Sequence, residues 1–294
     1  MQLSESAEGD GAVTILVRVD GAEVVDQVHQ GLVALSRVEE VRCRRDATGS
    51  WLLAACGVPN ADPDRLLQAV AAVVDRFDFL AEVIDVRRGA TELPGGGGGY
   101  RISARFAVAG AGASADAETI CLDAAHVFGT GVHASTRLAV EAMEEIADKE
   151  GGLPARILDV GTGSGVLALI AARLGGEEVL GIDICEDAVS VARRNVLAND
   201  LARQVTIAST PLTEVDGGFK LIIANVTASV CLRLAADIMK RLLPGGRLIV
   251  SGLQGRQGEE LESFFAGYGL QTVNCYAEGK WRCLTLCNGS AGQD

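Results

Sequence analysis

The sequence of 294 residues lacks the features of a membrane or secreted protein. Charged residues or glycines interrupt each apolar run well before the roughly 18 residues that a membrane-spanning helix needs. The N-terminus, Met1-Gln2-Leu3-Ser4-Glu5, is acidic and polar and does not resemble a signal peptide. We therefore expect a cytoplasmic protein that does not contact a membrane.

Cysteine pairs at metal-binding spacing are also missing. Eight cysteines are scattered along the chain, and the closest pair, Cys283 and Cys287, is too widely spaced for a C-x-x-C motif. This pattern supports neither a zinc site nor a dithiol redox motif, and it indicates buried thiols in a reducing compartment. We expect no metal ion.

Positively charged residues are fewer than negatively charged ones. The chain has 26 Lys and Arg against 39 Asp and Glu, which gives a formal net charge of −13. Such a protein lacks the electrostatic attraction that dominates nucleic-acid binding. We expect no direct contact with nucleic acid and a basic protein as partner. The alternative, that the acidity serves only solubility, remains open.

The most informative stretch present is residues 157–165, Ile-Leu-Asp-Val-Gly-Thr-Gly-Ser-Gly. It predicts a buried strand and a glycine turn, followed by an apolar helix over residues 166–174. A second apolar run then ends at Asp183. A strand, a glycine turn, a helix and a strand with an acidic tip form a nucleoside site in an open parallel sheet. Asp183 can accept hydrogen bonds from ribose hydroxyls.

The spacing of the glycines indicates which kind of nucleoside the site binds. A dinucleotide site has the pattern G-x-G-x-x-G, whereas Val166 occupies the position of its third glycine here. No G-x-x-x-x-G-K-[ST] motif for a nucleoside triphosphate occurs. Asp159-x-Gly161-x-Gly163-x-Gly165, together with Asp183, resembles the class I S-adenosylmethionine-dependent methyltransferases. The alternative is a glycine turn in another doubly wound protein.

Residues 1–92 predict a ferredoxin-like α+β domain. Apolar periodicity gives the order strand, helix, strand, strand, helix, strand, which is the split βαβ unit. The strands are expected at 13–20, 38–45, 50–56 and 80–86, and the helices at 22–35 and 62–77. Residues 93–122 predict a linker, since Gly95 to Gly99 are five consecutive glycines, followed by short strands at 100–107 and 118–122.

Residues 123–294 predict the catalytic domain. Strands alternate with helices through this half, which favours a doubly wound α/β sheet of seven strands with the last one antiparallel. The helix over residues 229–243 is expected to end at Pro244-Gly245-Gly246, and the fifth strand to cover residues 247–250.

A polar glycine loop, residues 126–137, leads into a helix over 136–147 with Ser135 or Thr136 as its cap. Its position before the sheet indicates a lid over the ligand, and the alternative is an ordinary helix-capping loop. We interpret His133 in this loop as a structural hydrogen-bonding residue, because a lone histidine more often has that role than a catalytic one.

With this loop included, the chain resembles the ribosomal protein L11 methyltransferase (PrmA) family. The resemblance covers roughly residues 118–288. Its motifs are Phe128-Gly129-Thr130-Gly131-x-His133-x-x-Thr136, the glycine turn, Gly181-Ile182-Asp183-Ile184, Ala224-Asn225-Val226-x-Ala228, Pro244-Gly245-Gly246 and Lys280-Trp281-Arg282. The loop motif is specific to the family, whereas the glycine motifs are shared by class I methyltransferases generally.

The resemblance implies a cofactor site for S-adenosylmethionine. The residues expected to bind the cofactor are Thr136, Gly161, Asp183, Asn225, Gly163, Phe128 and Thr130. Asn225 is also a candidate for orienting the methyl acceptor, and we assign no general base. The implied reaction is methylation of lysine ε-amino or N-terminal α-amino groups of a large-subunit ribosomal protein, with the ferredoxin-like domain docking that protein.

The sequence departs from the family on the acceptor side. The usual L-D-P-G is Leu122-Asp123-Ala124-Ala125, H-P-T-T is His133-Ala134-Ser135-Thr136, and N-I-L-A is Asn225-Val226-Thr227-Ala228. The family's tryptophan-rich linker is replaced by the glycine run and residues 100–117. Two other functions therefore remain open: a small-molecule N- or O-methyltransferase on the same fold, and a non-catalytic nucleoside-binding docking protein.

Overall fold

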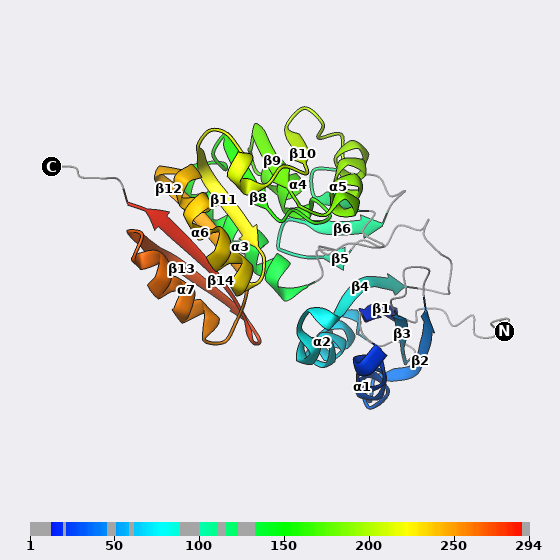
Figure 1. Cartoon of the computed structure of the whole chain (residues 1–294). Helices are drawn as coiled ribbons and strands as arrows, with labels where there is room; N and C mark the ends of the chain where they lie inside the picture. The colour runs from blue at the N-terminus through cyan, green and yellow to red at the C-terminus, as the bar shows by residue number, and fades with distance from the viewer. Residues whose placement is uncertain are drawn as a thin grey trace. The chain divides into compact units, whose positions relative to one another are not determined.

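The computed structural model describes residues 13–19, 22–45, 51–58, 62–88, 100–110, 116–122 and 133–289. The chain divides into two compact units, Met1–Tyr100 and Arg101–Asp294 (Figure 1). The predicted glycine run at 95–99 lies outside the described residues. None of the helices that the structure describes combines the length and apolar character needed to cross a bilayer.

The first unit is a four-stranded antiparallel sheet with two helices. Its sheet order is β2-β3-β1-β4, and its chain order is that of the split βαβ unit. The elements are β1 (Val13–Val19), α1 (Ala22–Val33), β2 (Val38–Arg45), β3 (Trp51–Gly57), α2 (Pro63–Val74), a 3₁₀ turn (Asp75–Leu80) and β4 (Ala81–Arg88).

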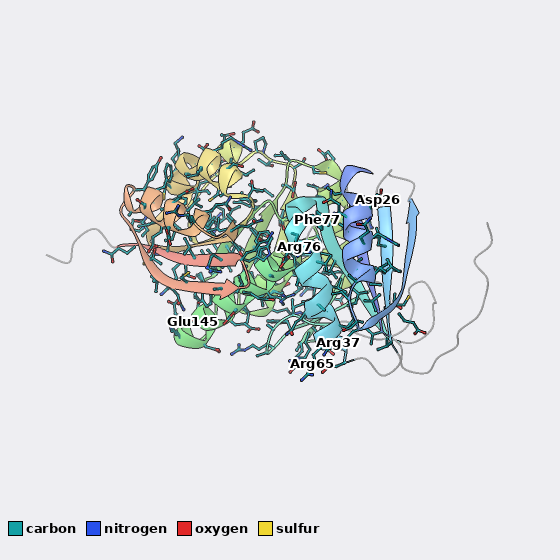
Figure 2. The ribbon with its side chains drawn as sticks, turned by 90° about the horizontal axis from the view of Figure 1, so that it is seen from below. Asp26, Arg37, Arg65, Arg76, Phe77 and Glu145 are labelled. Atoms are coloured by element: carbon teal, nitrogen blue, oxygen red, sulfur yellow. The ribbon has the colours of Figure 1, made fainter. Side chains whose placement is uncertain are left out.

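The alternation of β1 places Ile15 and Val17 in the core of this unit, where both are fully buried. The helices α1 and α2 approach closely at Gly31, where a Cβ atom would lie 2.6 Å from Cγ1 of Val73. The predicted second helix is shorter than expected, since Arg76 and Phe77 belong to the 3₁₀ turn (Figure 2).

The second unit contains a seven-stranded sheet in the order β10-β9-β8-β11-β12-β14-β13. The five strands from β8 to β12 are parallel, and β14 is antiparallel to both of its neighbours. The strands are β8 (Arg156–Val160), β9 (Glu178–Ile182), β10 (Val205–Ala208), β11 (Phe219–Asn225), β12 (Leu242–Gln254), β13 (Leu270–Glu278) and β14 (Trp281–Asn288). The predicted doubly wound sheet with an antiparallel last strand is confirmed.

The strand order reverses between β8 and β11. Right-handed crossovers that run in opposite directions from this point place their helices on opposite faces of the sheet. Accordingly α4 and α5 cover β8, β9 and β10, while α6 and α7 cover β11, β12 and β13, and α3 packs beside α4 (Figure 1). The helices are α3 (Ala134–Glu150), α4 (Val166–Arg173), α5 (Glu186–Ala198), α6 (Ala228–Arg241) and α7 (Gln257–Ala266). Ligands of such sheets bind at the reversal, outside the carboxyl ends of the strands.

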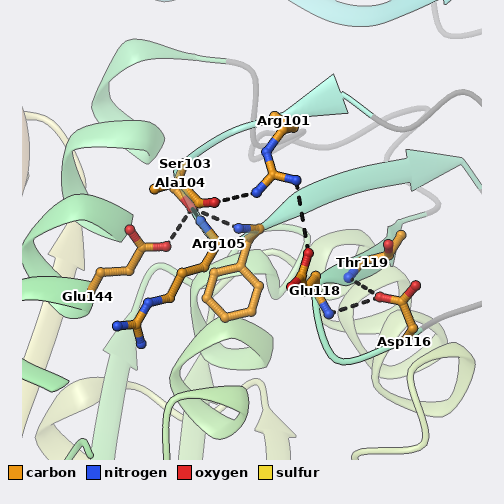
Figure 3. A network of polar contacts seen from close by, with 9 residues as sticks. Arg101, Ser103, Ala104, Arg105, Asp116, Glu118, Thr119 and Glu144 are labelled. Atoms are coloured by element: carbon orange, nitrogen blue, oxygen red, sulfur yellow. Dashed lines mark hydrogen bonds and ion pairs between the residues drawn. The ribbon is translucent and has the colours of Figure 1, made fainter. Parts of the chain in front are cut away.

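A small sheet of β5 (Tyr100–Arg101), β6 (Ala107–Gly110) and β7 (Thr119–Leu122) precedes this core. The single strand predicted at 100–107 is wrong, because a turn separates β5 from β6 (Figure 3). The hydroxyl of Ser103 forms this turn by accepting from the backbone N–H of Phe106 at 2.9 Å, and it donates to Glu144 of α3 at 2.5 Å. The polar contact of Ser103 with α3 outweighs the strand preference of the sequence.

The predicted end of α6 is also wrong. The helix ends at Arg241, whose buried guanidinium donates to the backbone oxygen of Val215 at 2.8 Å. Strand β12 then starts at Leu242 and includes the Pro-Gly-Gly segment, across which its register with β11 shifts. Gly245 has a φ of 68° there, so the segment is a bulge in a strand rather than the loop after a helix.

Candidate cofactor site

Three predicted site residues follow the carboxyl ends of neighbouring strands. Gly161 follows β8, Asp183 follows β9, and Asn225 is the last residue of β11. Val160 of β8 is paired with Ile182 on one side and with Ala224 on the other. The register therefore brings the three residues together at the edge where the strand order reverses.

The glycine turn is fixed by its own backbone hydrogen bonds. The N–H groups of Gly161 and Thr162 both donate to the carbonyl of Ile182 at 2.9 Å. Gly161, Gly163 and Gly165 have φ values of 71°, 55° and 85°, which side chains rarely adopt. A Cβ at Gly161 would also lie 2.7 Å from Cγ1 of Val226. The turn therefore requires glycine both for its conformation and for the close approach of the loop after β11.

The carboxylate of Asp183 joins the two loops. Its Oδ2 accepts from the N–H of Gly163 and its Oδ1 from the N–H of Cys185, both at 3.0 Å. Each carboxylate oxygen has two acceptor positions, so each can accept one further donor. Asp183 is half-buried, and the next residue, Ile184, is 88% exposed. The site thus offers two fixed acceptors beside an uncovered apolar side chain.

A second carboxylate lies under the glycine turn. Asp159 is almost completely buried, and its Oδ2 accepts from the hydroxyl of Thr162 at 2.6 Å. Burial is the largest cause that raises the pKa of Asp159, to about 7; the hydrogen bond from Thr162 opposes this shift and the nearby Asp183 carboxylate supports it. The proton of this carboxyl group is therefore exchanged in the physiological range of pH.

Thr136 and Asn225 are in contact. Thr136 is fully buried in the first turn of α3, and its hydroxyl oxygen accepts from Nδ2 of Asn225 at 3.3 Å. The other amide atom, Oδ1 of Asn225, is buried and has no hydrogen-bond partner among the residues that the structure describes. A buried acceptor without a donor costs free energy, so this oxygen indicates that a ligand N–H or O–H completes it.

His133 caps α3, and the predicted cap at Ser135 or Thr136 is wrong. Its Nδ1 accepts from the N–H of Ser135 at 3.2 Å, and its ring stacks edge-on against Trp281 with centroids 4.5 Å apart. Burial lowers the pKa of His133 to about 3, and the charges of Arg137 and Lys280 add to the shift. The imidazole is therefore neutral and structural, as the sequence indicates.

The hairpin of β13 and β14 borders the same edge beyond β12. Arg137 of α3 forms an ion pair with Glu278 at the end of β13. In the turn that follows, Nζ of Lys280 lies 5.4 Å from the ring centroid of Trp281. The ion pair fixes α3 against the hairpin, which lies beyond β12 from Asn225.

Two predicted site residues, Phe128 and Thr130, lie outside the described residues, whereas Thr136, Gly161, Gly163, Asp183 and Asn225 lie at one edge. Sequence reasoning did not assign a role to the exposed Ile184, although its position directly after an acidic strand tip was a usable signal. No group of three or more potential metal ligands occurs within the described ranges.

Comparisons with known proteins show which family the chain resembles. A model of the family "Ribosomal protein L11 methyltransferase (PrmA)" matches residues 99–288. Ribosomal protein L11 methyltransferase of Geotalea daltonii is 41% identical over 172 residues, which are 56% of this chain and 55% of that protein. The corresponding enzyme of Syntrophotalea carbinolica is 42% identical over 165 residues, covering 56% and 53%.

A solved structure is similar as well. The crystal structure of ribosomal protein L11 methylase from Lactobacillus delbrueckii subsp. bulgaricus superimposes with a TM-score of 0.59 at 29% sequence identity. The match covers 65% of this chain and 98% of that one. The chain spans about half the length of the curated relatives it matches.

Proposed function

Because the chain belongs to the ribosomal protein L11 methyltransferase (PrmA) family, we propose that it transfers methyl groups from S-adenosylmethionine to amino groups of ribosomal protein L11. The acceptors are lysine ε-amino groups, the N-terminal α-amino group, or both. A net charge of −13 supports a basic acceptor, because opposite charge accelerates encounter. The proposed place of action is the cytoplasm.

The observation that carries the proposal is the position of Asp183. Both of its oxygens are held by backbone N–H groups, and both can accept one hydroxyl of a ribose. The bond to Gly163 also fixes the ribose acceptor relative to the glycine turn. This arrangement fits a nucleoside whose ribose contacts Asp183 and whose amino-acid end crosses Gly161 and Gly163. Ile184 provides an apolar surface for the base.

The residues on the acceptor side position the amine. S-adenosylmethionine supplies a methyl group that is already activated by its sulfonium. Asn225 accepts an N–H of the incoming amine on Oδ1, while Thr136 holds the other end of the same amide. Orientation of this kind contributes several kcal/mol to methyl transfer. Because an amide does not titrate, Asn225 orients the amine and does not take its proton.

The direct test uses tritiated S-adenosylmethionine and L11 from a source that lacks the modification. We expect label on L11 with the unmodified protein, and with the control variant Ser229→Ala, whose side chain is exposed on α6. Asn225→Ala should lower the rate of labelling by a larger factor than it lowers the affinity for S-adenosylhomocysteine. If the protein binds the cofactor but L11 stays unlabelled, the small-molecule alternative is favoured. Absence of cofactor binding would contradict both enzymatic readings.

We also propose that residues 1–92 recognise the acceptor protein. The four-stranded sheet with two helices is the type of module that docks the ribosomal protein in the resembling family. Deletion of residues 1–92 should abolish labelling of L11 and leave the affinity for S-adenosylhomocysteine within about twofold. Retained labelling at an unchanged KM for L11 would contradict this assignment.

A further inference from the structure

Two asparagines at the C-terminal end of α5, Asn195 in its last turn and Asn199 as its C-cap, are buried where polar side chains are rare. Asn195 and Asn199 are each 1% exposed and lie four residues apart, so they share one face of the helix. A buried amide is costly unless its donors and acceptor are paired. The hydrogen bonds of these two side chains therefore show what this face of α5 holds in place.

Asn199 holds the strand β7. Its Oδ1 accepts from the N–H of Cys121 at 2.9 Å, and its Nδ2 donates to the carbonyl of the same residue at 2.7 Å. The N–H and C=O of one strand residue point to the same side, so the amide of Asn199 completes β7 as a neighbouring strand would. Nδ2 also donates to the carbonyl of Asn195 at 2.7 Å.

Asn195 holds the glycine turn. Its Nδ2 donates to the carbonyl of Ser164 at 2.8 Å, between Gly163, which donates to Asp183, and Gly165. Ala192 lies one turn earlier on the same face of α5 and packs closely against the turn. A Cβ atom added at Gly165 would lie 3.2 Å from the Cβ of Ala192. A small residue and an amide thus let α5 contact the turn directly and fix one of its carbonyls.

We propose that Asn195 and Asn199 are positioning residues of the cofactor site. Through them α5 holds two separate segments at a fixed spacing: the glycine turn that would contact the cofactor, and β7, which packs against α4 and α5. These hydrogen bonds of the two side chains are made to backbone groups. The inference rests on the proposed function, because it assigns a role toward the same cofactor.

The test compares the full-length variants Asn195→Ala and Asn199→Ala with Tyr276→Phe. Tyr276 is buried in β13, and its hydroxyl donates to Glu145 of α3 at 2.6 Å. Tyr276→Phe therefore removes one buried hydrogen bond, as the asparagine variants do, but at a place away from the glycine turn. Affinity for S-adenosylhomocysteine is measured by titration calorimetry at a temperature where circular dichroism shows all variants to be folded.

We expect Asn195→Ala to weaken this affinity about five- to tenfold, as loss of a turn-fixing hydrogen bond should. Asn199→Ala should weaken it about three- to fivefold, because Asn199 acts on the turn only through the backbone of α5 at Asn195, and Tyr276→Phe by less than about twofold. In the methylation assay, KM for the cofactor should rise by the same factor. The kcat at saturating cofactor and the KM for L11 should change less than about twofold. In the double variant the two effects should add, because Asn199 donates to the backbone carbonyl of Asn195, which Asn195→Ala keeps.

The proposal is overturned if the asparagine variants weaken binding no more than Tyr276→Phe does, or if kcat falls while KM for the cofactor is unchanged. A double variant that binds no more weakly than Asn195→Ala alone would overturn the role of Asn199. These outcomes differ from a failure of the proposed function, in which the unmodified protein itself binds no S-adenosylhomocysteine.

Discussion

Replacing Asp183 with alanine tests the ribose contact. The carboxylate has one acceptor position left on each oxygen, so a bound ribose gains two hydrogen bonds to a charged group. Such bonds contribute about 1.5 kcal/mol or more each, so Asp183→Ala should lose about 2–3 kcal/mol of binding, or roughly 30- to 150-fold in Kd. The same variant leaves the N–H groups of Gly163 and Cys185 without their acceptor, which loosens the turn.

Titration calorimetry with S-adenosylhomocysteine measures this change. Asp183→Asn keeps one acceptor oxygen and should have an intermediate affinity. Asp187→Ala is the matched control, because it removes the same charge from an exposed position in the first turn of α5. We expect its affinity to stay within about twofold. An affinity of Asp183→Ala within threefold of the unmodified protein would refute the assignment of Asp183 to the ribose.

Three further predictions concern the site. Thr136→Val should lower kcat about tenfold, because it releases the side-chain amide of Asn225. When Asn225 is already replaced by alanine, Thr136→Val should cause no further loss of kcat. Additive losses would show that Thr136 acts independently of Asn225. The carboxyl of Asp159 ionises near 3.8 in the unfolded chain and near 7 in the folded one, so the unmodified protein loses stability as pH rises through this range. In denaturant titrations, the free energy of unfolding of Asp159→Asn should therefore increase relative to the unmodified protein by up to about 4 kcal/mol between pH 4 and 7. A difference that does not change with pH would contradict a raised pKa for the buried carboxyl. The imidazole of His133 takes up its proton only near pH 3 in the folded protein, so the unmodified protein loses stability as pH falls from 6.5 to 3. His133→Asn should lose less free energy of unfolding over the same range, by on the order of 4 kcal/mol. Equal losses in the two proteins would show that the pKa of His133 is not lowered in the native state.

Local patterns sufficed to predict the sheet and the cofactor edge. The apolar run before Gly161 and the acidic tip at Asp183 each follow one strand, and parallel strands present their carboxyl ends at one edge. Placing Asn225 there needed only the position of the fourth strand. These predictions succeeded because the period of the strands and the requirement for glycine are local properties of the chain.

Contacts between distant segments could not be predicted. The bond from Ser103 to Glu144 spans 41 positions, and it turns a predicted strand into a bend. The bonds between Asn199 and Cys121 span 78 positions, so the sequence shows only a polar residue near the end of a helix. The pairing of Thr136 with Asn225, 89 positions apart, depends on how α3 packs against β11.

The central claim is that the carboxyl edge between the glycine turn and Asp183 holds S-adenosylmethionine. The most direct measurement is a crystal structure of the protein with S-adenosylhomocysteine. We predict that both ribose hydroxyls lie within hydrogen-bond distance of Asp183 and that the homocysteine end contacts Gly161 and Gly163. Ligand density at another place in the chain, with this edge empty or blocked by side chains, would contradict the account.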